Sequence, residues 1–253
     1  MRTAKSSQSI PDHELKILQV GAIWQFNRPF SNMSPLFDPE LGRRISDCGI
    51  VAVLILDRVE DAVQVARSLL AGGVTAIELT FRTPAALGAL KEIRAEVPEM
   101  IAGAGTILTA DQVHLAKEAG AHFGVAPGMN PRVLAAAREA GLSFAPGIAT
   151  PSDIEAALEF DCRLLKFFPA EPSGGLPYLN SIAAPYLHFG IKFFPLGGLS
   201  PANMASYLQD SKIAALGGSW LAPRDLINAG SWKEITELAQ SATATIKSVR
   251  SAS

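Results

Sequence analysis

The strongest constraint on the fold is an alternation of short apolar runs with amphipathic helical patterns, which repeats about eight times from Ile50 onward. Such alternation is typical of βα units around a parallel sheet. The expected strands are 50–56, 76–81, 100–106, 122–127, 143–149, 163–169, 192–197 and 213–217. These units predict an α/β fold, a single TIM (β/α)8 barrel, for which about 250 residues is typical. An open doubly wound sheet is the structural alternative.

The segments between the runs carry helix signals. The first helix is expected to follow Asp57 as N-cap, with Glu60 three residues later, and to end at Gly72 and Gly73. Prolines, which cost nothing in a first helical turn, stand where later helices are expected to begin: Pro84, Pro131, Pro151 and Pro201.

Residues 1–49 differ from the rest of the chain because they show scattered Ser, Pro, Asn and charge without a sustained period. We expect them to form an N-terminal extension that is irregular or partly disordered. The barrel domain is expected to span residues 50–250.

Charge and cysteine content narrow the function classes. With 48% hydrophobic residues and a formal net charge of -2, the chain has no basic field that would favour nucleic acid or an anionic membrane. No apolar run reaches the roughly 20 residues of a membrane span, and no secretory signal is visible. Cys48 and Cys162 are too few for a disulfide framework, which fits a reducing compartment. We predict a cytoplasmic protein that acts on a small molecule.

One lysine, Lys166, lies in the middle of the otherwise apolar expected strand 163–169. Burial beside hydrophobic walls disfavours an ammonium ion, and the neutral amine that it favours attacks carbonyl groups. The alternative is a strand-end lysine that reaches solvent or pairs with a carboxylate.

The second expected strand places polar side chains on one face. Because side chains alternate along a strand, Glu78, Thr80 and Arg82 share the face opposite Ile77 and Leu79. In a barrel this polar face points into the lumen, toward the carboxyl-terminal rim where barrel enzymes bind substrates. The same parity directs Lys166 and Phe168 into the lumen. An exposed edge strand with a surface Glu–Arg pair is the alternative.

Glycine pairs follow the last two expected strands. Gly197-Gly198 follow the seventh strand, and Gly217-Gly218 with Ser219 follow the eighth. Loops at these two positions of a barrel commonly bind phosphate, since glycine lets backbone N–H groups approach the oxygens. Ordinary turns are the alternative. The histidines, His13, His114, His122 and His188, show no ligand spacing, so no metal site is predicted.

Several segments together resemble the family of 2-keto-3-deoxy-6-phosphogluconate (KDPG) and 4-hydroxy-2-oxoglutarate aldolases over about residues 50–247. The matching segments are 77–83 (IELTFRT), 103–106 (GAGT), 126–128 (APG), 146–150 (PGIAT), 166–171 (KFFPAE), 195–203 (PLGGLSPAN) and 217–221 (GGSWL).

The resemblance implies a class I aldolase that needs no metal or other cofactor and cleaves KDPG to pyruvate and glyceraldehyde 3-phosphate. It implies Lys166 as the Schiff-base lysine and Glu78 as the proton shuttle. The substrate-binding residues that it implies are Arg82 and Thr106 for the pyruvate carboxylate, Pro127 and Phe168 for the pocket, and Gly197, Gly198, Gly218 and Ser219 for phosphate. It also implies a homotrimer.

The chain departs from the family pattern at Leu196, where threonine is usual. The resemblance places this position beside the aldehyde half of the substrate, so Leu196 is expected to influence specificity. The alternative substrates are the galactonate isomer and 4-hydroxy-2-oxoglutarate. A catalytically inert barrel that binds a phosphometabolite is a further alternative.

Overall fold

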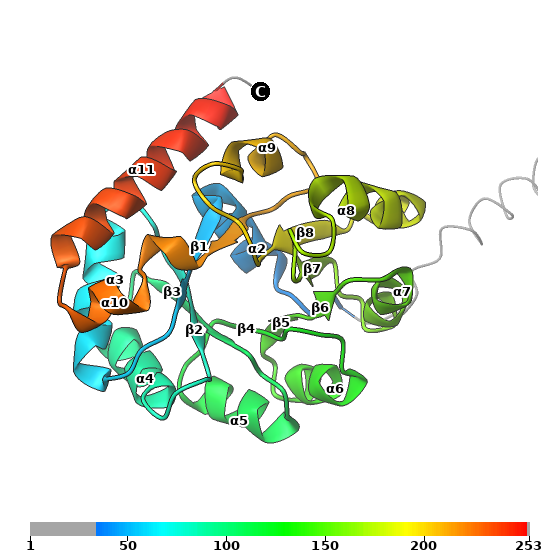
Figure 1. Cartoon of the computed structure of the whole chain (residues 1–253). Coiled ribbons are helices and arrows are strands. Elements are labelled where there is room, and N and C mark those ends of the chain that lie inside the picture. Colours follow the sequence, from blue (N-terminus) through cyan, green and yellow to red (C-terminus); the bar gives the residue numbers. More distant parts are fainter. Residues whose placement is uncertain (1–33, 252–253) are drawn as a thin grey trace, which may run out of the picture.

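The computed structural model describes residues 34–251, and its strands form a ring that helices surround (Figure 1). The strands are β1 (Ile50–Leu54), β2 (Ala76–Thr80), β3 (Ile101–Gly105), β4 (Phe123–Val125), β5 (Ser143–Ala145), β6 (Gly147–Ile148), β7 (Leu164–Phe167), β8 (Lys192–Pro195) and β9 (Leu216–Gly218). All their pairings are parallel, as the βα alternation predicts.

Helical segments connect and follow the strands. The α-helices are α2 (Pro39–Cys48), α3 (Ala62–Ala71), α4 (Ala86–Glu96), α5 (Ala110–Glu118), α6 (Pro131–Glu139), α7 (Pro151–Glu159), α8 (Gly175–Ala183), α9 (Met204–Leu208), α10 (Arg224–Asn228) and α11 (Trp232–Ser251). Short 3₁₀ turns are η1 (Val59–Asp61), η2 (Ala184–Phe189) and η3 (Ser219–Leu221).

The strands close into the predicted (β/α)8 barrel. One sheet runs in the order β5-β4-β3-β2-β1-β9 and the other in the order β6-β7-β8. Only Pro146 separates β5 from β6, so the two occupy one place in the barrel, and a parallel bridge between Phe193 and Ile213 joins the other side. The fifth expected strand is interrupted because proline has no N–H for the ladder. Its carbonyl still accepts from the Lys166 N–H at 2.8 Å.

The helix starts follow the predicted capping at two of the five expected places. Pro131 and Pro151 occupy the first turns of α6 and α7, as predicted. Pro84 and Pro201 instead lie in turns shortly before α4 and α9. The prediction that Asp57 caps the first helix is wrong. The chain passes through η1 before α3 begins at Ala62, and the Asp57 carboxylate binds Arg224 instead.

Two apolar layers separate along each strand with a period of two. Ile77, Leu79 and Phe167 pack outward in the large core between strands and helices. Leu164 and Phe194 belong to a second cluster inside the barrel. The parity predicted for the second and sixth expected strands is therefore confirmed, since Leu164 and Phe168 share the inner cluster.

Part of the segment expected to be irregular is a helix. Asp38 caps α2 by accepting from the Leu41 N–H at 2.7 Å, Pro39 occupies its first turn, and Gly49 ends it with φ 77°. A sequence signal was available, because Leu41 and Ile45 are four residues apart between these caps. Residues 1–33 of the predicted extension lie outside the described residues.

Helix α2 closes the amino-terminal end of the barrel. Phe37, Leu41 and Ile45 join the inner cluster, where Phe37 packs against Phe123 with ring centroids 6.0 Å apart. In Figure 1, α2 (blue) lies near the centre of the molecule and is not one of the helices that surround the strands. The lumen is thereby filled at this end and leaves the carboxyl-terminal end for a site.

Candidate active site

A buried ion pair spans the lumen. The Lys166 Nζ atom, from β7, donates to Glu78 Oε1 at 3.1 Å and Oε2 at 3.3 Å, from β2. Lys166 is 5% and Glu78 is 1% exposed. Burying two charges costs free energy even when they are paired, because their attraction only partly offsets the loss of hydration. The pair is therefore a candidate for a functional role and not for a stabilising one.

Gly105 provides the space that the Glu78 carboxylate occupies. The β2–β3 register places Thr80 opposite Gly105, and a Cβ added at Gly105 would lie 1.8 Å from Glu78 Oε1. Any larger residue at position 105 would therefore displace the carboxylate. Residues 103–105 are small in the sequence, but no local pattern predicts this contact.

Aromatic side chains border the lysine. The Phe168 ring centroid lies 5.6 Å from Lys166 Nζ. Phe194 lies opposite Lys166 in the β7–β8 register and belongs to the inner apolar cluster. On β2, the Thr80 hydroxyl donates to the Leu54 carbonyl at 3.0 Å. This hydroxyl is therefore engaged by the backbone, and Glu78 is the residue of β2 that contacts Lys166. The amine thus meets a carboxylate on one side and hydrophobic rings on others.

Arg82 and Thr106 follow the adjacent strands β2 and β3 and lie at the same rim. The Phe81 N–H donates to the Gly105 carbonyl at 2.8 Å, which holds the two chain segments together. Arg82 is exposed and Thr106 is half-buried. Within residues 34–251, neither the Arg82 guanidinium nor the Thr106 hydroxyl has a hydrogen-bond partner. Both groups are available to a ligand.

The Thr106 backbone is strained, with φ at 60°. A β-branched residue rarely adopts this left-handed conformation, which typically costs about 1–3 kcal/mol and occurs preferentially at functional sites. The strain gives independent weight to the choice of Thr106 as a site residue.

The other expected pocket residues flank this centre. Pro127 is half-buried, and a Cβ added at Gly147 would lie 2.2 Å from its carbonyl oxygen. Gly147 is the register partner of Lys166, so Pro127 borders the strand beside the lysine. Leu196 is 5% exposed and belongs to the inner cluster. Its Cγ atom would lie 2.1 Å from a Cβ at Gly217, so only glycine fits beneath it.

The two glycine-rich loops are neighbours at the rim, because Leu196 packs directly on Gly217. Gly197 and Gly198 have φ of 94° and 83°, which favours glycine. In the described part of the chain, the N–H groups of Gly198 and Leu199 donate to no protein acceptor. Ser219 is exposed beside Gly218. These groups fit an anion that accepts from backbone N–H.

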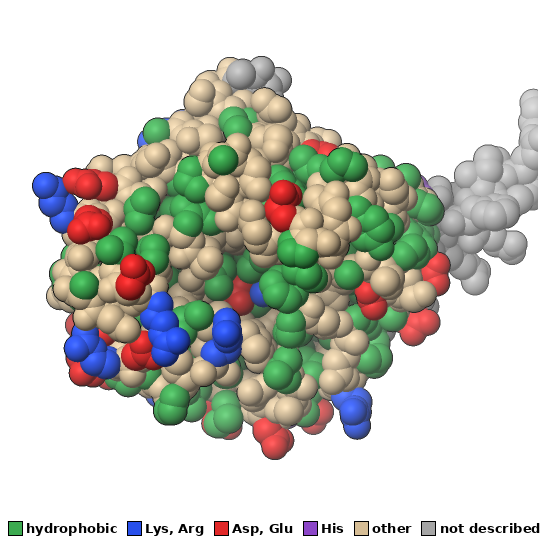
Figure 2. Space-filling view, in the orientation of Figure 1, with side chains coloured by type: hydrophobic (Ala, Val, Ile, Leu, Met, Phe, Trp, Pro, Cys, Tyr) green, Lys and Arg blue, Asp and Glu red, His purple; other side chains and the backbone are tan. Residues whose placement is uncertain are grey.

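Figure 2 shows a hollow in the centre of this face, with basic and acidic side chains visible inside it. No three His, Cys, Asp or Glu side chains among residues 34–251 are arranged to hold a metal ion. His122 accepts from the Ala102 N–H through Nδ1 at 3.1 Å, and burial lowers the pKa of its ring. His114 and His188 are exposed, and His13 lies outside the described residues.

No helix between residues 34 and 251 has the length and apolarity to cross a membrane.

Comparison with known families shows a match over most of the chain. The family model for KDPG and KHG aldolase matches residues 42–238. The 2-dehydro-3-deoxy-phosphogluconate aldolase of Treponema pallidum (strain Nichols) is 44% identical over 191 residues, which cover 76% of this chain and 90% of the relative.

Solved structures agree with this match. The KDPG aldolase of Legionella pneumophila, with pyruvate captured at low pH as a covalent carbinolamine intermediate, has a TM-score of 0.75 and 34% identity, covering 79% of this chain and 96% of that one. The 2-keto-3-deoxy-6-phosphogluconate aldolase of Zymomonas mobilis ZM4 with 3-phosphoglycerate has a TM-score of 0.74 and 36% identity, covering 82% of this chain and 96% of that one.

Proposed function

The chain belongs to the KDPG and KHG aldolase family, and on that premise we propose that it cleaves KDPG to pyruvate and glyceraldehyde 3-phosphate through an iminium on Lys166. The observation that carries this proposal is the Lys166–Glu78 pair, buried in the lumen with Nζ and Oε1 3.1 Å apart. The covalent carbinolamine of pyruvate in the Legionella pneumophila enzyme supports an amine nucleophile.

Iminium formation begins with proton transfer. Glu78 takes a proton from Lys166, and the neutral Nζ atom attacks the C2 carbonyl carbon of the substrate to give a carbinolamine. Glu78 then returns a proton to the C2 hydroxyl, which leaves as water. The rings of Phe168 and Phe194 form the apolar wall beside the reacting amine.

Carbon–carbon cleavage follows because the iminium nitrogen accepts electrons. Glu78, directly or through water, takes the proton of the C4 hydroxyl as the C3–C4 bond breaks. The C3–C4 electron pair moves into an enamine, and glyceraldehyde 3-phosphate leaves. Protonation of the enamine at C3 and hydrolysis of the resulting iminium release pyruvate and regenerate Lys166.

Two groups of residues at the rim of the barrel suit the two ends of this substrate. Arg82 and Thr106 have unused donors beside the lumen and would bind the carboxylate, with a charge-assisted bond from the guanidinium. The Gly197-Gly198 and Gly218-Ser219 loops would bind the phosphate. The complex of the Zymomonas mobilis enzyme with 3-phosphoglycerate supports a phosphate site in this fold.

Leu196 is proposed to contact the aldehyde half of the substrate. The Leu196 N–H donates to the Phe167 carbonyl at 3.0 Å, and Leu196 and Phe168 both belong to the inner cluster. An apolar wall forms no directional bond to a C4 hydroxyl and so discriminates weakly. The galactonate isomer and 4-hydroxy-2-oxoglutarate are therefore the proposed alternative substrates. The homotrimer, the cytoplasmic location and the independence of metal stay predictions.

A covalent trap tests the proposal. Borohydride added with pyruvate should leave one stable reduced adduct per chain, and mass spectrometry should place it on Lys166. Lys166→Met should abolish the adduct, whereas the control Lys117→Met should not, because Lys117 binds the Gly141 carbonyl on the surface. An adduct on another lysine, or labelling that survives Lys166→Met, would remove the proposed chemistry.

A further inference from the structure

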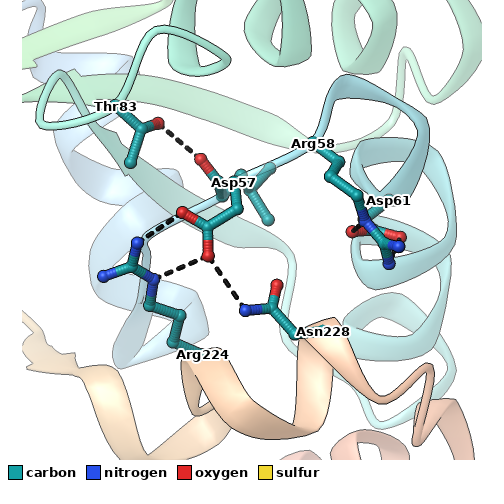
Figure 3. Close-up of polar contacts among 7 residues, drawn as sticks. Asp57, Arg58, Asp61, Thr83, Arg224 and Asn228 are labelled. Atoms are coloured by element: carbon teal, nitrogen blue, oxygen red, sulfur yellow. Dashed lines mark hydrogen bonds and ion pairs between the residues drawn. The ribbon is translucent and has the colours of Figure 1, made fainter.

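A polar cluster joins loops that follow the first and last strands of the barrel (Figure 3). Asp57 lies in the loop after β1, and Arg224 and Asn228 begin and end α10. Arg224 Nε donates to Asp57 Oδ2 at 2.7 Å, and Arg224 Nη2 donates to Oδ1. Asn228 Nδ2 donates to Oδ2 at 2.9 Å. We call Asp57, Arg224 and Asn228 the rim clamp.

The rim clamp fixes the far end of a proposed phosphate loop. The stretch 219–223 follows Gly218, which pairs with Ala52 of β1. It is followed by Arg224, which binds Asp57 just beyond β1. Leu221, midway, is fully buried in the outer core. Ser219 is thus carried by a short loop that is tied at both ends to the same strand and its extension.

A second contact ties the opposite end of the site to the loop after β1. The Thr83 hydroxyl donates to the Leu56 carbonyl, and Thr83 directly follows Arg82. Leu56 directly precedes Asp57. Residues 56–57 therefore anchor two segments. One bears Arg82, the proposed carboxylate-binding residue, and the other bears the proposed phosphate loop 219–223.

We infer that Asp57 and Arg224 are positioning residues for the phosphate end of the substrate, and that they favour phosphorylated over non-phosphorylated substrates. This inference rests on the proposed function. The clamp touches no reacting atom. It acts by holding Ser219 and the Gly218 backbone where the phosphate is bound, so its loss should weaken phosphate binding and leave the chemistry on Lys166 unchanged.

The charges and the geometry of the rim clamp indicate that its ion pair is present near neutral pH. Two hydrogen bonds from one guanidinium orient both partners, and the bonds from Arg224 hold the pKa of Asp57 at about 2. Asp57 is therefore ionised near neutral pH. The Arg224 side chain is 55% and that of Asp57 is 29% exposed, so solvent screens the pair and a moderate effect is expected.

The double variant Asp57→Asn/Arg224→Gln tests the inference, because it removes the ion pair without changing the net charge. We expect KM for KDPG to rise about twofold to fivefold, the range of a surface ion pair. The inhibition constant of inorganic phosphate should rise in parallel. The kcat for KDPG, and both constants for phosphate-free 4-hydroxy-2-oxoglutarate, should stay unchanged.

Single variants separate position from charge. If the clamp positions the loop, Asp57→Asn and Arg224→Gln each raise KM for KDPG. If the pair acts only through charge, Asp57→Asn lowers this KM, Arg224→Gln raises it, and the double variant returns to the unmodified value. That second pattern would overturn the inference, as would an equal loss for both substrates.

A remote ion pair and the covalent trap serve as controls. Lys233→Gln/Glu237→Gln removes an exposed pair on α11, Nζ to Oε1 3.8 Å, and should leave all constants unchanged. Labelling with pyruvate and borohydride should be complete in the double variant. If the unmodified protein is not labelled, the proposed function fails. If it is labelled but the double variant keeps its preference for KDPG, only the clamp inference fails.

Discussion

Lys166 and Glu78 combine chemical reactivity with a position that excludes water. In the proposed mechanism this almost fully buried pair, with Nζ and Oε1 3.1 Å apart, transfers protons directly during iminium formation. The same burial makes each partner depend on the other, since removing one leaves a buried charge uncompensated.

Replacing Glu78 with Gln should separate binding from turnover. Gln keeps the shape and a hydrogen-bond acceptor for Lys166 but cannot carry protons, so kcat should fall about 100-fold to 10,000-fold. Pyruvate binding, measured by calorimetry, should persist. The exposed Glu60→Gln variant serves as the control. Nearly normal turnover in Glu78→Gln would reduce Glu78 to a structural residue.

Leu196 should set the stereochemical preference. We expect a modest ratio of kcat/KM for the gluconate and galactonate isomers, because an apolar wall separates similar molecules by only about 1–3 kcal/mol. Leu196→Thr should raise the ratio as a hydroxyl contact becomes available.

Leu196→Val is the matched control, because Val and Thr have nearly the same shape and leave the same space above Gly217. The ratio should not rise with Val. An equal rise in both variants would attribute the change to volume. A ratio of about four orders of magnitude in the unmodified protein would place stereochemical control elsewhere.

Helix α2 determines how the barrel is closed at its amino-terminal end. Its capping signals lie within Asp38 to Gly49. Its role in closing the barrel depends on side chains that enter the lumen from the amino-terminal end. Ile45 is 3% exposed and packs in the inner cluster with Val51 and Phe194.

Ile45→Ala should therefore destabilise the whole barrel. A buried Ile→Ala substitution costs about 2–5 kcal/mol, so the urea midpoint should fall, while kcat and KM near 25 °C change little because the lysine lies beyond this cluster. Arg44→Ala, exposed on the same helix, should leave the midpoint in place. An unchanged midpoint in Ile45→Ala would mean that α2 is only loosely attached.

In the proposed mechanism, the complete barrel brings together an electron sink, a proton carrier and two anion-binding regions of its rim, from strands that are distant in sequence. Because the iminium on Lys166 accepts the electrons of the breaking bond, we expect activity to survive prolonged treatment with EDTA, measured by coupled detection of pyruvate. Loss of activity that a divalent ion restores would assign the protein to another class of aldolase chemistry.

The sequence alone determined the repeat, the strands and the faces of the strands. Periods of two and 3.6 residues, prolines in first turns and glycine pairs are local signals, so the lumen direction of Glu78 and Lys166 was predictable. The irregularity predicted up to residue 49 was wrong over α2, because a short helix with few apolar residues produces a weak period.

Only the tertiary structure decided which side chains meet. Glu78 and Lys166 are separated by 88 positions, and Asp57 and Arg224 by 167. Local propensity suggested that Asp57 caps a helix, whereas barrel closure brings a guanidinium from the other end of the domain to it. Contacts across the lumen and between rim loops depend on strand register and closure, which no local pattern encodes, and they set the distances on which the proposed chemistry depends.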